Sequence, residues 1–358
     1  MIEVLRNKTY RALFSAQVIA LLGTGLLTVA LGLLAFDLAG DAAARVLGTA
    51  LTIKMVAYVG VAPVVAALVD RIPKKAVLVG ADAVRFAIAL MLPFVTEAWH
   101  IYVLVFVLQS ASAIFTPAFQ SLIPAVVPEA RNYTRALSLS RLAYDLEALL
   151  SPTIASYDNL FVGTAIGFAG SAALVLATAL PPHPSVRDSS TFWQRLPAGA
   201  LVFFRTPSLR FLLFTNVVVA AGTAIILVNS VVYAKGIFEL DDTALAIALG
   251  TYGVGSLIVA VNVPRLVDRI GVTRAMLSGT VLVVGGLTAA LVVTVFAVTT
   301  STGWWALLAT WLILGIGTSL ISTPSSRLLA DASTPANRNL VYTAQFALSH
   351  ACFLVTYP

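Results

Sequence analysis

Charged and polar side chains gather on one side of an apolar segment near residue 145. At 100° per residue along a helix they fall within an arc of roughly 160°, and they are Ser140, Arg141, Tyr144, Asp145, Glu147 and Ser151. Arg141 and Asp145 are four residues apart and can pair on that side, whereas Glu147 has no basic residue four positions away. A carboxylate held away from water exchanges protons near neutral pH. Glu147 and Asp145 are therefore candidate proton carriers; alternatively, Asp145 and Arg141 form a structural ion pair that fixes this helix to a neighbour.

A second apolar segment carries Lys54 near its middle. If such segments cross a lipid bilayer, a charge at their centre costs about 2.5–3.5 kcal/mol and seldom faces lipid. Lys54 then either binds an anionic group of a ligand or pairs with Asp145 or Glu147. Asp82 and Arg85 lie only two turns into their own segment, so we expect them to extend to the nearer membrane surface.

The composition indicates what kind of molecule holds these groups. Of 358 residues, 59% are apolar and 11% are charged, whereas soluble domains have roughly 45–50% apolar and about 25% charged residues. The chain is therefore predicted to be an all-α integral membrane protein. Its one cysteine, Cys352, excludes an intramolecular disulfide and a CxxC metal or redox site. The net charge of +6 is scattered between apolar runs, so we expect no nucleic-acid partner.

The apolar runs have the length of transmembrane helices. A helix needs about 20 mostly apolar residues to cross the hydrocarbon layer of a bilayer. We predict eleven spans, at 11–36, 44–69, 76–96, 101–127, 135–157, 160–180, 211–234, 243–263, 275–298, 304–325 and 340–358. The polar group around residue 145 thus belongs to the fifth span, and Lys54 belongs to the second.

The loops differ in their content of Lys and Arg, which cytoplasmic loops retain. The N-terminal tail and every second loop hold seventeen of the 22 basic residues, and the opposite loops hold only Arg45 and Lys235. The remaining three are Lys54, Arg85 and Arg141. We therefore predict a multi-pass protein of the bacterial inner membrane with a cytoplasmic N-terminus.

Parts of the sequence repeat in the same order. The string LVDRI occurs at 68–72 and at 266–270, each time in the loop predicted to follow the second span of a half. With a shift of 199, Arg11, Gln17, Gly23 and Thr24 match Arg210, Asn216, Gly222 and Thr223. With a shift of 207, Thr116, Pro117, Arg131 and Asn132 match Thr323, Pro324, Arg338 and Asn339. Parallel repeats are typical of transporters whose two halves move about a central site.

The repeat predicts the domain organisation. We expect an N-terminal six-helix bundle at 1–180, a cytoplasmic linker at 181–209 with a short amphipathic stretch around 192–204, and a C-terminal bundle of about five helices at 210–358. Gln17 and Asn216 occupy matching positions in the first and seventh spans. They either hydrogen-bond between helices, which contributes about 0.6 kcal/mol, or contact a substrate. Gly250, Gly253, Gly255, Gly315 and Gly317 are predicted to permit close helix packing.

Two strings carry a resemblance to a known family. ALVDRIPKK at 67–75 and RLVDRIGVTR at 265–274 resemble the loop signature of the major facilitator superfamily, although Ala66, Pro264 and Pro73 replace glycines of that pattern. The resemblance implies two six-helix bundles related by a pseudo-two-fold axis along the membrane normal. Members of the family have a twelfth span, so we expect that this chain is truncated before it and that its second bundle is incomplete.

A finer resemblance is to the enterobactin-exporter-like and NreB-type nickel-resistance branch of that superfamily. It is carried by 115–142, FTPAFQSLIPAVVPEARNYTRALSLSRL, and by 347–358, ALSHACFLVTYP. The fourth span lacks the buried arginine of proton-coupled drug antiporters, and the fifth lacks their glycine-rich motif. This branch implies export of a siderophore or of a divalent metal such as nickel or cobalt.

The signature strings predict a cytoplasmic gate. Asp70 and Asp268 can accept hydrogen bonds from helix N-termini across the two halves, which contributes roughly 0.3–1 kcal/mol at an exposed site. Arg71, Lys74, Arg269 and Arg274 can pair with facing carboxylates or lipid phosphates. Together these residues would hold the cytoplasmic side closed in one state and release it in the other. The alternative is that they only set the topology.

The sequence lacks the motifs of enzymes. It has no Walker loop, HExxH or GxSxG motif, so we predict no catalytic residues and no cofactor. The three histidines, His100, His183 and His350, are not clustered, so no metal site is predicted; a nickel site would require His350, Cys352 and carboxylates to converge.

The interpretation that follows is a monomeric secondary transporter that exports a small solute by proton exchange and has the lipid bilayer as its surroundings. Divalent-metal or siderophore export is the alternative within this class. An alternative of another class is a non-transporting membrane protein that lacks its last helix.

Overall fold

A computed structural model describes residues 2–39, 43–69, 72–154, 157–181, 191–297 and 302–356, and these residues are helical almost throughout. Within them, eight helices are long and apolar enough to cross a membrane. Three further helices of the bundle, α6, α7 and α14, fall outside that group. In α6 the reason is its charge, because Arg131, Arg135, Arg141, Asp145 and Glu147 lie within its 25 residues.

The first part of the chain forms seven long or medium helices. They are α1 (Lys8–Ala39), α2 (Ala43–Val56), α3 (Ala62–Val69), α4 (Lys74–Met91), α5 (Ala98–Val126), α6 (Ala130–Ile154) and α7 (Tyr157–Ala177). Short turns η1 (Ile2–Arg6), η3 (Ala57–Val61) and η4 (Leu92–Phe94) adjoin them. The turn η3 is a π-helix, a form that often marks functional positions, and it joins α2 and α3 into one span.

The second part begins with two short helices, α8 (Phe192–Arg195) and α9 (Ala198–Arg205), which cover the predicted amphipathic stretch around 192–204. The longer helices are α10 (Pro207–Val231), α11 (Asp242–Ile270), α12 (Val272–Val292), α13 (Gly303–Asp331) and α14 (Arg338–Thr356). Two π-helical turns, η5 (Val232–Ile237) and η6 (Val293–Ala297), extend α10 and α12.

Each part of the chain has its own apolar core. In the first, α7 packs on α1 and α4, and α5 and α6 complete the group. In the second, α13 lies at the centre and packs on α10, α11 and α12. The largest core cluster holds Trp311, Met276 and Leu307 and consists of residues from 203 to 344. Phe203 of α9 belongs to it, so this end of the linker is packed with the C-terminal helices.

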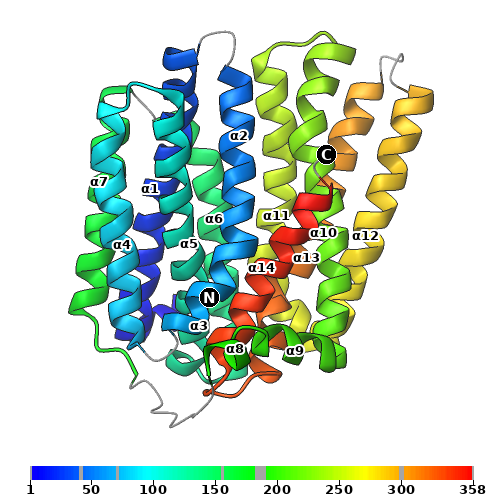
Figure 1. The fold of residues 1–358 in the computed structure, drawn as a ribbon. Helices are drawn as coiled ribbons and strands as arrows, with labels where there is room; N and C mark the ends of the chain where they lie inside the picture. The colour runs from blue at the N-terminus through cyan, green and yellow to red at the C-terminus, as the bar shows by residue number, and fades with distance from the viewer. Residues whose placement is uncertain are drawn as a thin grey trace.

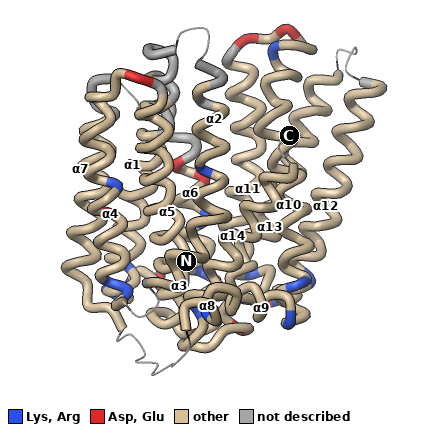
Figure 2. The backbone as a smooth tube through the Cα atoms, in the orientation of Figure 1, with Lys and Arg blue, Asp and Glu red and all other residues tan. Residues whose placement is uncertain are grey.

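The two groups of helices meet along two seams (Figure 1). In one seam α6 lies against α11 and α13, and in the other α14 lies against α5, η3 and α3. The helices α8 and α9 lie at one end of the bundle, which we name the linker face. Lys and Arg positions concentrate at this end (Figure 2).

Several predicted boundaries shift, chiefly because helices continue past the predicted apolar runs. The predicted eighth span ends at 263, but α11 continues to Ile270 and stops at Gly271, whose φ of 84° suits glycine. The second LVDRI string, which we predicted to lie in a loop, is therefore the last part of a helix. Likewise, α13 continues to Asp331 and α6 starts at Ala130.

Candidate functional site

A cavity of about 430 Å³ lies between the two groups of helices. Residues of α1, α2, η3, α4, α5 and α6 line it on one side, and residues of α13 and α14 line it on the other. Its wall is mixed, because hydroxyl and amide groups such as Ser322, Ser325 and Gln120 alternate with aromatic rings. A cavity of this size, with a few polar groups among apolar ones, is typical of a small-molecule site.

Two of the predicted charged residues line this cavity. Glu147 of α6 and Lys54 of α2 both belong to its wall, and the negative charge of Glu147 attracts the Lys54 ammonium. The Lys54 Nζ lies 5.6 Å from the centre of the Tyr58 ring, one helical turn further on. Of the two arrangements predicted for Lys54 as an ion-pair partner, the structure thus favours Glu147 over Asp145.

The prediction for Asp82 and Arg85 was wrong. They pair with each other in the protein interior, where Asp82 is fully buried and Arg85 is 3% exposed. The Arg85 guanidinium lies 4.1 Å from the ring of Phe115 and 4.7 Å from that of Phe168. It lines the cavity. The position of the two residues near the start of their span suggested that they reach the membrane surface. However, the side of α4 that carries them faces α5 and α7, so the pair lies in the protein interior.

The matched residues Gln17 and Asn216 both hydrogen-bond between helices. The Ser140 hydroxyl of α6 donates to Gln17 Oε1 at 2.9 Å, and Gln17 also lines the cavity. Asn216 of α10 and Gln345 of α14 exchange two amide hydrogen bonds of 3.0 and 3.2 Å. Asn216 is thus occupied by its neighbour, and its partner Gln345 reaches the cavity instead.

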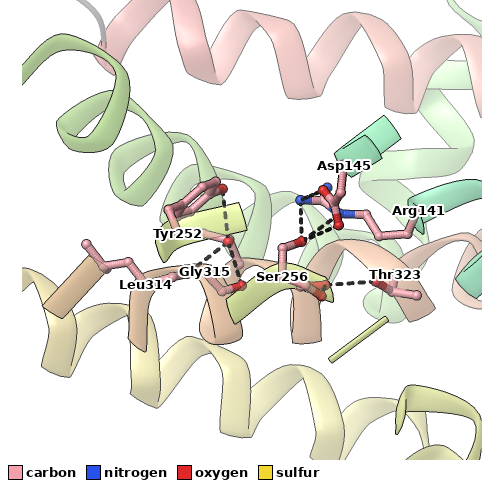
Figure 3. A network of polar contacts seen from close by, with 9 residues as sticks. Arg141, Asp145, Tyr252, Ser256, Leu314, Gly315 and Thr323 are labelled. Carbon is pink, nitrogen blue, oxygen red and sulfur yellow. Dashed lines mark hydrogen bonds and ion pairs between the residues drawn. The ribbon is translucent and has the colours of Figure 1, made fainter. Parts of the chain in front are cut away.

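The predicted Arg141–Asp145 ion pair is confirmed, with 3.0 Å between Arg141 Nη2 and Asp145 Oδ1. It does not line the cavity but joins the two groups of helices (Figure 3). Ser256 of α11 donates to Asp145 Oδ2 at 2.7 Å. The same hydroxyl oxygen accepts from Arg141 Nε at 3.1 Å and from Nη2 at 2.9 Å.

Figure 3 shows that this contact continues into the second group of helices. The Ser319 hydroxyl donates to the Ser256 carbonyl oxygen at 3.1 Å and lies 3.3 Å from the Thr323 hydroxyl. Ser256 and Ser319 are fully buried. The network therefore anchors α6 to α11 and α13 through the middle of the bundle.

Toward the linker face, two buried tyrosines close the space below the cavity. The hydroxyl groups of Tyr133 in α6 and Tyr342 in α14 lie 2.8 Å apart, and both donate to the Ser326 carbonyl oxygen. Nearby, Arg327 Nη1 donates to the Thr134 hydroxyl at 3.0 Å. Ser326 itself lines the cavity, so these contacts form its floor.

The predicted gate residues lie at the linker face where the structure describes them. Asp268, at the end of α11, pairs with Arg131 at the start of α6, with 3.1 Å between Arg131 Nε and Asp268 Oδ2. Arg269 and Arg274 are exposed, and their side chains form no hydrogen bond or ion pair within the described ranges. Lys74 begins α4 and is half-buried. Asp70 and Arg71 lie outside the described residues.

Sequence reasoning missed three residues of this region, Ser256, Tyr133 and Tyr342, and considered His350 only as a possible metal ligand. The His350 ring packs 4.6 Å from that of Tyr58 and 4.3 Å from that of Phe346, in the cavity wall. In the sequence, the other three were distinguished only by their hydroxyl groups. Their places beside the cavity could not be inferred, because the residues that they contact lie far away in the chain.

The residues that a nickel site would require do not converge. His350 lines the cavity, whereas the Cys352 thiol donates to the Leu348 carbonyl oxygen of its own helix. Among the residues that the structure describes, no group of three or more His, Cys, Asp and Glu side chains could hold a metal ion.

Curated relatives are efflux proteins. The chain is 24% identical to macrolide efflux protein A of Streptococcus pyogenes over 152 residues, which are 41% of this chain and 37% of that protein. It is 27% identical to macrolide efflux protein A of Enterococcus faecalis over 104 residues, 28% of this chain and 32% of that protein. The matches thus span about a third of the length of these relatives.

Solved structures share the fold over nearly the whole chain. The human organic anion transporter MFSD10 (TETRAN) superposes with a TM-score of 0.81 at 12% identity, covering 98% of this chain and 92% of that one. A bacterial homologue of the iron transporter ferroportin, in an outward-facing state, gives 0.75 at 15% identity, with 98% and 91% covered. The family model of the Major Facilitator Superfamily matches residues 13–350. The chain therefore belongs to the Major Facilitator Superfamily and has the major facilitator fold of its transporters.

Proposed function

We propose that this transporter exports a small solute from the cytoplasm in exchange for protons. The observation that carries the proposal is the position of Glu147, which lines a cavity between the two groups of helices together with Lys54, whose ammonium its negative charge attracts. A carboxylate in such a place can gain and lose a proton as the cavity opens to either side. Glu147 is the proton carrier in this scheme, and Asp145 with Arg141 forms part of the joint between the helices.

The direction of transport and the orientation of the protein in the membrane have separate supports. The curated relatives are efflux proteins, and basic residues concentrate at the linker face, as they do on the cytoplasmic side of membrane proteins (Figure 2). With that face in the cytoplasm, the tyrosine contact and the Arg131–Asp268 pair close the cytoplasmic side. The two halves, 1–180 and 210–358, would then rock about the cavity, and breaking these contacts would open it inward.

The test is proton movement in lipid vesicles that contain the purified chain and a pH-sensitive dye. A panel of aromatic anions, cations and neutral compounds is added from one side. We expect at least one compound to move protons, and Glu147→Gln to abolish that movement because an amide carries no exchangeable acid proton. Glu239→Gln is the matched control, since Glu239 is an exposed carboxylate outside the cavity.

The outcomes separate the alternatives. Loss of proton movement in Asp145→Asn but not in Glu147→Gln would transfer the carrier role to Asp145. Proton movement driven by Ni²⁺ or Co²⁺ alone would favour the metal-exporting branch, for which the described residues offer no cluster of ligands. A folded protein that moves no proton with any compound would favour the non-transporting reading.

A further inference from the structure

We infer that the cavity contains a binding site for the anionic group of an aromatic solute, built from Arg85 and Ser112. The inference rests on the proposed function only in taking this cavity as the place where the solute binds. It goes further by naming the solute's chemical class, an aromatic carboxylate or sulfonate, and the side chains that would recognise it.

Arg85 is a buried cation that faces an open space. The residue is 3% exposed, yet it belongs to the cavity wall. Arg85 Nη2 donates to Asp82, which is not part of the cavity lining, whereas the Arg85 Nε has no hydrogen-bond partner within the described part of the chain. An unmatched guanidinium donor in a low-dielectric site is unfavourable, and a carboxylate or sulfonate oxygen would satisfy it with a charge-assisted hydrogen bond.

Ser112 provides an independent second observation. Ser112 is 7% exposed and lines the same cavity. Among the described residues its hydroxyl has no hydrogen-bond partner, whereas Ser110, two residues earlier on the same helix, donates to the carbonyl oxygen of Phe106. Ser112 lies on α5 one turn before Phe115, whose ring the Arg85 guanidinium contacts at 4.1 Å. The two residues that carry these unsatisfied donors therefore belong to the same wall.

The cavity wall combines cationic groups with aromatic rings. Its described lining contains the bases Lys54, Arg85 and His350 and the acid Glu147, and Asp82, which is outside the lining, pairs with Arg85. Aromatic rings of Tyr58, Phe119 and Phe346 also line it, and they offer faces against which a flat apolar body can stack. An aromatic cation cannot accept a hydrogen bond from the Arg85 Nε or from the Ser112 hydroxyl, so it would leave both donors unsatisfied.

The test is binding by calorimetry to the full chain in a non-ionic detergent. The probes share one ring system: 2-naphthalenesulfonate is the anion, 2-naphthalenesulfonamide is neutral, and 2-naphthyltrimethylammonium is the cation. We expect the anion to bind at least about tenfold more tightly than the other two. Equal binding of the three probes would overturn the inference.

Two variants assign the binding to this wall. Removing Arg85 alone would leave Asp82 buried without a partner, so the variant combines Asp82→Asn with Arg85→Gln and keeps the net charge unchanged. We expect it to lose the preference for the anion. Ser112→Ala removes one hydroxyl, folds normally and weakens anion binding about threefold. Arg205→Gln, at an exposed arginine of α9, is expected to bind as the unmodified protein does. Unchanged anion binding in Ser112→Ala and in the double variant would refute the site.

Binding and transport can fail separately. Anion binding without proton movement in vesicles would contradict the proposed function and leave the anion site intact. Proton movement with another solute, together with no preference for the anion in the binding experiment, would contradict the anion site and leave the proposed function intact.

Discussion

The hydroxyl groups of Tyr133 and Tyr342 lie 2.8 Å apart, and both donate to the Ser326 carbonyl oxygen. Tyr133 belongs to α6 and Tyr342 to α14, so one carbonyl group of α13 holds helices from both parts of the chain. Both tyrosines are almost fully buried, at 4% and 1% exposure. The contact therefore joins the two parts of the chain beside the cavity, at the position of Ser326.

Replacing either tyrosine by phenylalanine should loosen this closure. One buried hydrogen bond contributes about 0.5–1.5 kcal/mol, which corresponds to about a two- to tenfold larger open population. The measurement is the reaction rate of Ser326→Cys with a maleimide, in a background where Cys352→Ser removes the native thiol. We expect Tyr133→Phe and Tyr342→Phe to increase that rate by this factor.

A buried tyrosine inside one part of the chain provides the control for this experiment. The Tyr10 hydroxyl donates to the Ala136 carbonyl oxygen, from α1 to α6, and Tyr10 is 1% exposed. Tyr10→Phe loses a comparable bond but none between the two groups of helices. If Tyr10→Phe raises the labelling rate as much as Tyr133→Phe does, the tyrosine contact is not a specific closure.

Ser256→Ala removes only one hydroxyl group, but it should destabilise the protein clearly. The Asp145 carboxylate would lose a buried donor, and hydrogen bonds to charged groups contribute about 1.5–3 kcal/mol. We expect a lower melting temperature in detergent and in lipid. Ser278→Ala is the control, because Ser278 is exposed and only donates to the carbonyl oxygen of its own helix. Equal melting temperatures of the two variants would show that the Asp145 contact contributes little.

The sequence was sufficient for the helices and for part of the site. The length and apolar content of each run predict the spans because a bilayer requires a long helix whose backbone is hydrogen-bonded internally. The ion pair of Arg141 and Asp145 follows from their four-residue spacing within one helix. Placement of Glu147 near Lys54 could be stated only as one of several pairings.

What the sequence could not supply are contacts between helices far apart in the chain. Asp145 and Glu147 are two residues apart on one polar side of α6, yet the first contacts Ser256 and the second lines the cavity. That difference depends on how α6 is rotated against α11, which the packing of both helices decides. Arg85 was misplaced for the same reason, because depth along a helix does not reveal which neighbour its side chain meets.

The ion pair between Arg131 and Asp268 should contribute little and depend on salt. Its side chains are 62% and 36% exposed, and exposed pairs typically contribute up to about 1 kcal/mol. We expect Asp268→Asn to speed labelling of the Ser326→Cys reporter at low ionic strength, and about 1 M salt to remove most of the difference because it screens exposed charges. A double-mutant cycle with Arg131→Gln isolates the pair. A difference that persists in high salt would point to a hydrogen bond of Asp268 with a helix end instead.

Gly315 and Gly250 should respond oppositely to alanine. A Cβ at Gly315 would collide with the backbone carbonyl of Tyr252, so α11 and α13 would have to separate, at a cost of roughly 1–3 kcal/mol. The sequence prediction of close packing is confirmed for Gly255, Gly315 and Gly317, but it is wrong for Gly250, where a Cβ would meet nothing within 4 Å.

Gly250→Ala is therefore the matched control within α11, and it should be neutral or stabilise by up to about 1 kcal/mol, since alanine restricts the unfolded backbone. Melting temperatures of both variants, measured in the same detergent, check the contrast. Because the junction of α11 with α13 also positions Ser256 and Ser319, we expect Gly315→Ala to weaken the Asp145 contact. Ser256→Ala should then cost less in the Gly315→Ala background than alone, and strictly additive effects would show that the two features are independent.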